Sequence, residues 1–370
     1  MVVDEVPSPR APVALLVGAG HAHLHVLLRA ERLADAGYEV HLLAPPEFRY
    51  SGVASASAAG TMDGHAGVVD VAALAASRPV RYHRGRLVGL DGHRALSDDG
   101  AQIEWDVLAV NVGSVAAEPR MGVGPGVVPV KPLDALAGLR ERIEAAAATG
   151  APRRVTVVGA GPSGLELAGH LSTRSDVEVH LIDQGPSPLA GLPPGAHAAV
   201  VRLLRARGVR LRTGVSVAQL TSRRLRLRDG SESTHDVAVL ATGLAAPGWL
   251  AGVGLSDPTS PDAGIPVRST LQHRDAPTVY ATGDCADFLP GPLAKVGVYG
   301  VRQGPVLLES LLARAAGEPL PEFVPQRHAL QILDLGAGWG LAVRGRRWWL
   351  GRSALRLKRR IDARWLRQYR

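Results

Sequence analysis

The 370-residue chain is long enough to form two or three domains, each with its own hydrophobic core. It contains no run of about eighteen uncharged apolar residues, so no membrane-spanning helix is expected, and Asp4 and Glu5 near its start argue against a signal peptide. Cys285 is the only cysteine, which excludes an internal disulfide and a redox-active cysteine pair and favours a cytoplasmic protein.

The first part of the chain alternates between apolar runs typical of strands and longer segments typical of helices. Gly- and Pro-rich segments and an Asp-Asp-Gly turn separate these runs. The expected elements are a strand at 13–17, a glycine turn, a helix to about residue 36, strands at 39–43, 80–90 and 101–112, a connector at 116–132 and a helix at 133–148.

The second part repeats this plan and then adds a further strand and helix. The expected elements are a strand at 154–158, a glycine turn, a helix to about residue 173, a strand at 177–183, a helix at 195–207, strands to residue 242, a connector at 245–266, a strand from 278 that runs into Gly283 and Asp284, and a helix at 297–316. The alternation of strands and helices predicts an α/β fold with parallel sheets.

The repeat extends to matching motifs in the two halves. Val17–His23 and Val158–Gly164 both place glycines after an apolar strand, and each is followed about eighty residues later by a strand that ends in glycine, at Gly113 and Gly243. A strand that turns on glycines into a helix leaves backbone N–H groups that can bind a pyrophosphate. Two such turns predict two dinucleotides.

We therefore expect two Rossmann-like dinucleotide-binding domains, with an NAD domain inserted into an FAD domain, and a small C-terminal α+β region with a basic amphipathic helix. The expected boundaries are 1–118 for the first part of the FAD domain, 119–254 for the NAD(H) domain, 255–316 for the second part of the FAD domain and 317–370 for the C-terminal region.

The second glycine motif is complete. Gly159, Gly161 and Gly164 satisfy the Gly-x-Gly-x-x-Gly pattern, and Asp183 follows the next strand. A carboxylate there accepts hydrogen bonds from the ribose 2′-hydroxyl and repels a 2′-phosphate, so we expect NADH to be preferred over NADPH. The alternative is a tight turn without a ligand.

The first motif departs from the pattern at two places. His23 occupies the third glycine position, and Ala44 stands where the ribose acid is expected, with Glu47 as a substitute from the loop. The three histidines at 21, 23 and 25 cannot converge on one metal if they lie on a helix, so no metal site is expected. Cys285 is interpreted as a small buried residue, with a redox role beside a flavin as the alternative.

Several of these segments resemble a known family. Gly159–Glu166, Ala241–Gly243 and Thr282–Ala286 resemble the flavoproteins with two dinucleotide-binding domains, the pyridine nucleotide-disulfide oxidoreductase superfamily, and among them the type II NADH dehydrogenases. The segments Gly18–Val26, Tyr50–Gly52, Pro129–Pro132 and Lys295–Pro305 are similar to the flavoprotein that some bacteria carry joined to selenophosphate synthetase.

This resemblance implies roles for individual residues. The residues expected at FAD are Gly18, Ala19, Gly20, His21, Tyr50, Ser51, Leu87, Gly113, Gly283, Asp284, Gly297 and Val298, and those expected at NAD(H) are Gly159, Gly161, Gly164, Asp183 and Gly243. Lys295 is the candidate cation near the flavin, with a solvated loop lysine as the alternative. Glu166 resembles a glutamate beside the nicotinamide, although an acid in the first turn of a helix is also stabilised by the helix dipole.

The quinone-side motif of the type II dehydrogenases, Ala-Gln-x-x-x-Gln, falls on Val298, Tyr299 and Gln303 in this chain, so only the second glutamine is kept. We expect an FAD-dependent NAD(P)H oxidoreductase that passes electrons directly to an acceptor, with quinone first. The alternatives are an acidic electron-transfer protein or a selenium-linked substrate as the acceptor, or a flavin-binding sensor or assembly protein with little turnover.

The last thirty residues carry the net positive charge of the chain. They contain ten arginines, one lysine and a single acid, Asp362, and Leu357, Ile361, Trp365 and Tyr369 recur at helical spacing. This pattern is typical of a helix on the inner face of an anionic membrane. The alternatives are packing on the protein body or an acidic protein partner. Nucleic acid is not expected, and a homodimer is left open.

Overall fold

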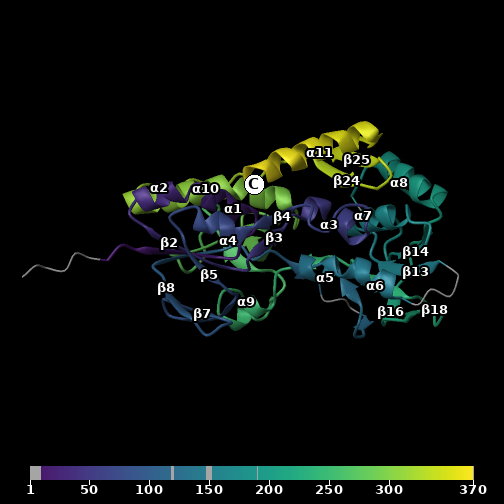
Figure 1. The fold of residues 1–370 in the computed structure, drawn as a ribbon, viewed down its shortest axis with the longest axis horizontal. Coiled ribbons are helices and arrows are strands. Elements are labelled where there is room, and N and C mark those ends of the chain that lie inside the picture. Colours follow the sequence, from purple (N-terminus) through teal and green to yellow (C-terminus); the bar gives the residue numbers. More distant parts are fainter. Residues whose placement is uncertain (1–9, 118–120, 147–151, 190, 370) are drawn as a thin grey trace, which may run out of the picture. The chain divides into compact units, whose positions relative to one another are not determined.

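The computed structural model describes residues 10–117, 121–146, 152–189 and 191–369. They divide into two compact units. Of the described residues, unit 1 consists of 10–48, 70–113 and 246–325, and unit 2 of 49–69, 114–117, 121–146, 152–189, 191–245 and 326–369 (Figure 1). The expected boundary at residues 118 and 119 lies outside the described residues. The short strands β3 (Glu47–Arg49) and β4 (Val68–Asp70) lie where the chain passes from unit 1 to unit 2 and back.

A five-stranded parallel sheet forms the centre of unit 1, in the order β22-β9-β1-β2-β5. Its strands are β1 (Val13–Val17), β2 (Glu39–Ala44), β5 (Arg81–Arg84), β9 (Val107–Val110) and β22 (Val279–Ala281). Every residue of β1 and β9 is buried, which is the pattern of parallel strands covered on both faces. The predicted Rossmann-like arrangement is therefore present in unit 1.

The helices of unit 1 are α1 (His21–Leu27), α2 (Ala30–Asp35), α4 (Val71–Ala76), α9 (Trp249–Gly252) and α10 (Gly297–Ala316). The single helix expected up to residue 36 is divided, because Arg29 leaves the helical region with φ −131° and ψ 24°. α10 spans the predicted residues 297–316. It packs closely on α1: a Cβ at Gly304 would come within 2.8 Å of the His25 Cβ.

The remaining elements of unit 1 are short. An antiparallel sheet consists of β6 (Leu87–Asp91), β7 (Arg94–Ser97) and β8 (Gln102–Glu104), and a parallel pair consists of β21 (Ile265–Val267) and β23 (Ala286–Phe288), with the 3₁₀ turn η1 (Gly283–Cys285) before β23. The strands expected at 80–90 and 101–112 are each divided in two, since their central residues turn between sheets.

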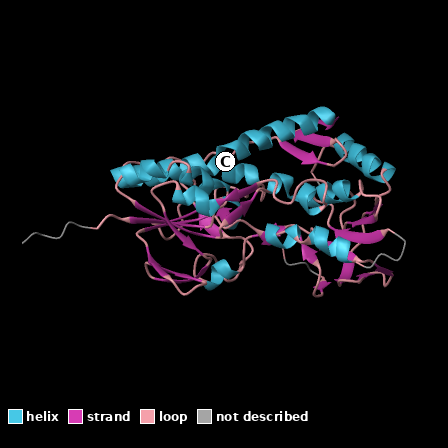
Figure 2. Ribbon diagram, in the orientation of Figure 1, coloured by secondary structure: helices cyan, strands magenta, loops and turns pink. Residues whose placement is uncertain are grey.

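Unit 2 has a parallel sheet of the same design, in the order β12-β19-β13-β14-β15. Its strands are β12 (Val128–Pro129), β13 (Arg153–Val158), β14 (Val177–Ile182), β15 (Arg210–Arg212) and β19 (Val237–Leu240). The order β19-β13-β14-β15 matches β9-β1-β2-β5 of unit 1. Strands and helices alternate along the chain in both units (Figure 2). The predicted α/β fold with two Rossmann-like domains is confirmed.

The helices around this sheet are α3 (Ser51–Ala58), α5 (Leu133–Ala137), α6 (Leu139–Ala145), α7 (Pro162–Leu171) and α8 (Pro194–Ala206). The helix expected at 133–148 is divided at Gly138, and its last two residues lie outside the described part. The smaller sheets are β11 (Gly122–Val123) with β16 (Val217–Leu220), β17 (Arg224–Leu227) and β18 (Glu232–Thr234), and β10 (Val115–Ala116) with β20 (Leu244–Ala245).

The C-terminal part of unit 2 is an antiparallel sheet followed by a helix. It consists of β24 (Gln331–Asp334), β25 (Gly340–Arg344), β26 (Arg347–Gly351), α11 (Arg352–Leu366) and η2 (Arg367–Tyr369). Leu335 and Leu341 of this part share one hydrophobic core with Ala58 of α3 and Leu165 of α7. Residues 49–69 and 326–369 thus lie in the same compact unit as the second glycine motif, and the expected domain boundaries stay a prediction.

α11 buries mainly residues other than the apolar ones that recur at helical spacing in its sequence. Its buried residues are Ala354, Leu355, Lys358, Asp362 and Trp365. Ile361 is 44% exposed, and Trp365 is the only buried member of the predicted apolar face. One lysine and one aspartate, whose burial the spacing of the apolar residues did not predict, pair with each other in the interior. No described helix combines the length and the apolar character that crossing a membrane requires.

Candidate functional site

The glycine turn of unit 1 is shaped by its close approach to the end of β9. Gly18 has φ +84°, and a Cβ there would lie 2.6 Å from the Asn111 carbonyl oxygen. A Cβ at Gly20 would overlap the Asn111 side chain. Gly20 is followed directly by α1. Both glycines are therefore required by sterics, and the turn leads into the helix as the motif predicts.

Asn111 connects three strand ends of unit 1, a role that the motif analysis missed. Its Oδ1 accepts hydrogen bonds from the backbone N–H groups of Ala22, at 3.1 Å, and His23, at 3.4 Å. Its Nδ2 donates to the Thr282 carbonyl at 2.7 Å. The side chain thus satisfies two N–H groups in the first turn of α1. The sequence feature that could have predicted this role is an asparagine at the end of an otherwise apolar strand.

His23 fits into the third glycine position as a buried neutral side chain. It is fully buried, and its Nδ1 lies 2.6 Å from the Gly18 carbonyl oxygen. Burial lowers the pKa of His23 to about 4, although the bond to Gly18 acts in the other direction. The Nδ1–H of a neutral ring therefore donates to Gly18. His21 and His25 lie against Gly300 and Gly304 of α10 instead of converging on one point.

The loop at Gly283–Asp284 is held by two side chains from the α10 region. The Gln303 Oε1 accepts a hydrogen bond from the Gly283 N–H at 2.6 Å, and Gln303 is 1% exposed. The Lys295 ammonium donates to the Asp284 carbonyl at 2.6 Å. No side chain caps the N-terminus of α10. Lys295 and the helix dipole thus place positive charge beside this loop, whereas Gln303 serves to position its backbone.

The other residues expected at FAD are spread over both units. Ala19 is buried in the glycine turn, Leu87 is buried at the start of β6, and Val298 is half-buried in the first turn of α10. Gly113 has φ +75°, and nothing lies within 4 Å of where a Cβ would stand at this residue. Tyr50 and Ser51 belong to unit 2, where Tyr50 immediately precedes α3.

The glycine turn of unit 2 contains two positions that are crowded, Gly159 and Gly164, and one that is open, Gly161. A Cβ at Gly164 would overlap the Gly159 carbonyl oxygen, and Gly159 has φ +109°. By contrast, nothing lies within 4 Å of where a Cβ would stand at Gly161. Gly161 is also the N-cap of α7, and no side chain caps that helix. The open space and the helix N-terminus fit a pyrophosphate.

Asp183 lies directly after β14, as the ribose-binding acid requires. Its Oδ2 accepts from the Ala160 N–H at 2.6 Å, and its Oδ1 accepts from the Gly185 N–H at 2.7 Å. Each carboxylate oxygen can accept a second hydrogen bond. The side chain is therefore fixed against the glycine turn and keeps the capacity to bind ribose hydroxyls. Gly243, at φ +125°, follows β19.

Comparison with known proteins agrees with this geometry. Residues 14–305 match the family described as pyridine nucleotide-disulphide oxidoreductase. The chain belongs to this family. Its members use FAD and NAD(P)H, so both cofactors belong to this chain as well, and the glycine turns of the two units fit them.

Two of the curated relatives are named as a reductase and a dehydrogenase-like protein. The chain is 32% identical over 214 residues to the nitric oxide reductase FlRd-NAD(+) reductase of Aeromonas hydrophila, which covers 55% of this chain and 51% of that protein. It is 29% identical over 203 residues to the NADH dehydrogenase-like protein YutJ of Bacillus subtilis, covering 51% and 53%. The chain thus spans about half the length of these curated relatives.

A solved structure shows the same fold. The sulfide:quinone oxidoreductase of Aquifex aeolicus superposes with a TM-score of 0.79 at 15% identity, over 97% of this chain and 92% of that one. The similarity to type II NADH dehydrogenases that the sequence predicted is therefore confirmed at the level of the family. The narrower resemblance to the flavoprotein joined to selenophosphate synthetase stays a prediction.

Glu166 lies on α7, in contact with the C-terminal part of unit 2. Its Oε1 accepts a hydrogen bond from the Asp334 backbone N–H at 2.8 Å. Burial raises the pKa of Glu166, although the charge of Lys358 and the bond from Asp334 oppose the rise. A carboxyl group with a raised pKa keeps its acid form to higher pH than a solvated glutamate and can therefore give or take a proton.

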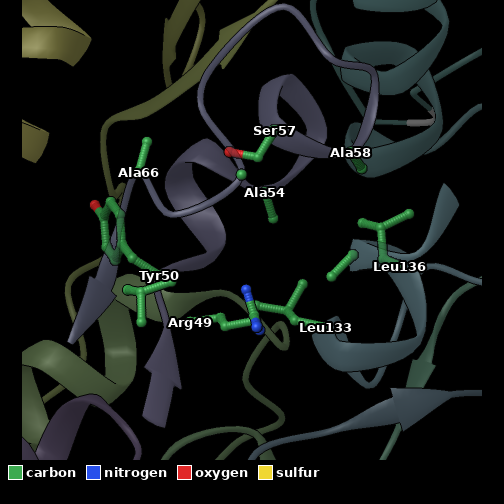
Figure 3. Close-up of a pocket in the computed structure, with 11 residues that line it drawn as sticks. Arg49, Tyr50, Ala54, Ser57, Ala58, Ala66, Leu133 and Leu136 are labelled. Atoms are coloured by element: carbon green, nitrogen blue, oxygen red, sulfur yellow. The ribbon is translucent and has the colours of Figure 1, made fainter. Parts of the chain in front are cut away.

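A small pocket in unit 2 adjoins Tyr50. Figure 3 shows Ala54, Ser57 and Tyr50 on one side and Leu133 on another, with the Arg49 side chain reaching between them. The Arg49 Nε donates to the Asp134 carboxylate at 3.1 Å. The lining consists mainly of small apolar side chains.

Cys285 is a structural residue. Its side chain is fully buried, and its Sγ donates to the Thr282 carbonyl at 3.3 Å. Burial raises the pKa of the Cys285 thiol to about 11. Because the thiolate is the reactive form, this cysteine is inert at neutral pH, in agreement with its interpretation as a small buried residue.

Proposed function

We propose that this protein is an FAD-dependent NAD(P)H oxidoreductase, with NADH as its electron donor. The observation that carries the proposal is the repeated glycine turn. Each unit contains a parallel sheet with a central strand that turns on glycines into a helix, and in each turn a side chain at a glycine position would collide with the residue that follows the neighbouring strand. Two dinucleotide sites in one chain suit a bound flavin and an exchangeable nicotinamide.

The residues of each unit would hold one cofactor. In unit 1, Gly18 and Gly20 would approach the FAD pyrophosphate, and Asp284 would hold the ribityl chain. In unit 2, Gly159 and Gly161 would bind the NADH pyrophosphate, and Asp183 would accept hydrogen bonds from the ribose and disfavour a 2′-phosphate. When bound, FAD accepts a hydride from NADH and returns the two electrons to a second substrate.

Three side chains have proposed roles around the reaction. The Lys295 ammonium and the N-terminus of α10 would stabilise negative charge on the cofactor. Glu166 would hold or release a proton, because its raised pKa keeps the acid form available. Gln303 would act through Gly283, whose N–H it binds. We propose that the remaining residues expected at FAD, among them His21, Ser51 and Val298, also contact this cofactor.

Electrons would leave the flavin directly. The sequence has one cysteine, and that cysteine is buried, so a cysteine pair cannot carry them. We propose a quinone as the acceptor. The single retained glutamine of the quinone-side motif is not an argument for this acceptor, since Gln303 is engaged with Gly283.

The C-terminal region supports a membrane location for such an acceptor. Lys358 and Asp362 of α11 are buried and paired with each other, so the exposed charge of this helix comes from arginines. Trp349 and Ile361 are 39% and 44% exposed in the same region. Exposed arginines with interfacial aromatics suit an anionic membrane surface. The same positive charge also suits an acidic electron-transfer protein.

The test is an anaerobic titration of the flavin-loaded protein with NADH, followed by absorbance, with a soluble quinone added at the end. Bleaching by NADH and recovery on quinone are the expected results. A flavin that NADH does not bleach would refute the oxidoreductase proposal and favour a sensor. Bleaching without recovery would refute quinone and direct the search to ferredoxin-like proteins or selenium-linked substrates. Sedimentation with anionic vesicles tests the membrane contact.

A further inference from the structure

Two buried carboxamide side chains of unit 1 contact the same peptide group. The Asn111 Nδ2 donates to the Thr282 carbonyl at 2.7 Å, and the Gln303 Oε1 accepts from the Gly283 N–H at 2.6 Å. These two backbone groups belong to the one peptide that joins Thr282 to Gly283. Asn111 is 3% exposed and Gln303 is 1% exposed, so water does not compete for either contact. The two side chains therefore fix the orientation of this peptide through both of its polar groups.

The close approach of the Asn111 carboxamide requires glycine at position 283. Gly283 has φ +69°, and a Cβ there would lie 2.7 Å from the Asn111 Nδ2. The Thr282 carbonyl also accepts from the Cys285 Sγ at 3.3 Å, but a thiol is a weak donor, so the Asn111 amide is the stronger partner of this carbonyl. Asp284 follows the fixed peptide directly, so its place depends on the orientation of that peptide.

Asn111 holds the glycine turn of unit 1 at the same time. Its Oδ1 accepts from the Ala22 and His23 N–H groups at 3.1 and 3.4 Å, and its backbone carbonyl accepts from the Gly20 N–H at 3.1 Å. The carboxamide cannot be reversed, because its NH₂ group would then face two N–H groups and its oxygen would face the Thr282 carbonyl. One side chain thus connects the first turn of α1 with the peptide that precedes Asp284.

We propose that Asn111 and Gln303 are positioning residues for FAD, which hold the Thr282–Gly283 peptide between them and keep Asp284 at a fixed place relative to the glycine turn. The inference rests on the proposed function, in which this turn approaches the FAD pyrophosphate and Asp284 holds the ribityl chain. A loop that is already ordered binds the cofactor without the entropic cost of ordering it on binding. Neither residue has to touch FAD for this effect.

The first test is the rate at which the FAD-loaded protein releases FAD on dilution, followed by flavin fluorescence. Asn111→Leu and Gln303→Met each remove one contact at similar side-chain volume, and each should release FAD about tenfold faster than the wild type. Because both residues act through one peptide, the double variant should be little faster than the faster single variant, whereas independent effects would multiply. Ser310→Ala truncates another fully buried side chain of α10 and serves as the matched control with the wild-type rate.

The second test is hydrogen exchange of the Gly283 N–H in the FAD-loaded protein, measured by NMR with nitrogen-15-labelled glycine. Asn111→Leu leaves the Gln303 acceptor of this N–H in place, yet the exchange should become about tenfold faster, because the peptide has lost its other contact. The Gly18 N–H, which is bonded to β2 at 2.8 Å, should keep its rate. A purely structural role of Asn111 would instead loosen unit 1 and speed exchange at both glycines.

Further variants keep the inference distinct from the proposed function. If Asn111→Leu does not fold, Asn111→Asp keeps the acceptor for α1, removes only the donor to Thr282 and should give the same local change in exchange. Wild-type exchange of Gly283 in these variants would overturn the inference, as would multiplied effects on FAD release in the double variant. Asp284→Asn should also release FAD faster. Unchanged release in Asp284→Asn would refute the proposed ribityl contact alone, since the exchange of Gly283 does not depend on it.

Discussion

Acidification should destabilise this protein through His23, the buried histidine at the third glycine position. The pKa of His23 is lowered from 6.5 to about 4 in the folded state, mainly by burial. Between these two values the unfolded chain binds a proton and the folded chain does not, so stability is lost as the pH falls from 6.5 towards 4. At about 1.4 kcal/mol per unit of pKa, the full loss is about 3.5 kcal/mol, of which about 3 kcal/mol is reached at pH 4, where folded His23 is half protonated.

The assay is urea unfolding of the wild type and His23→Asn at about pH 7 and about pH 4, with FAD at one fixed concentration. The asparagine amide can still donate to the Gly18 carbonyl but does not titrate. Its smaller volume should cost about 1–3 kcal/mol at both pH values. The loss between the two pH values should then be smaller than in the wild type by about 3 kcal/mol.

Two controls separate His23 from general acid effects. His65→Asn removes an exposed histidine and should keep the wild-type pH dependence. In His25→Asn the free energy of unfolding should also depend less on pH than in the wild type, because the pKa of His25 is also lowered to about 4 by burial and by Arg29. If His23→Asn loses as much stability as the wild type on acidification, the neutral buried state assigned to His23 is wrong.

Other predictions follow from the same contacts. Gly164→Ala should lower the melting temperature, because its Cβ would overlap the Gly159 carbonyl. Gly161→Ala should keep the melting temperature and weaken NADH binding about tenfold or more. Equal melting temperatures for the two variants would contradict this difference in crowding. The folded-state pKa of Glu166 is raised, so the contribution of Glu166 to the free energy of unfolding is fully present below about pH 4.5, the ordinary glutamate value. This contribution is lost as the pH rises through the raised folded-state pKa. Glu166→Gln should lack this loss in unfolding measurements across pH. Cys285 should react with a thiol reagent only after unfolding, and Cys285→Ala should still be bleached by NADH; rapid labelling of the native protein would refute its burial.

Local sequence was sufficient for features whose cause lies within a few residues. The strands predicted at 13–17 and 154–158, each followed by glycines, lie within one residue of β1 and β13, because a strand that bends sharply into a helix needs residues without side chains. α10 begins and ends where predicted, with Gly317 in the left-handed conformation as its C-cap. The repeat of strands and turns was likewise enough to predict two Rossmann-like sheets.

Tertiary structure decided what buried polar groups do, because their partners are distant in sequence. Asn111 reaches Thr282 across 171 residues, and Lys358 reaches Gly52 across 306. The sequence pattern predicted no role for Lys358 or Asp362, since burying one charge alone is costly, and only the fold supplies the partners that make a buried pair tolerable. Gln303 has the residue type expected of a substrate contact, but the fold directs it to the Gly283 backbone.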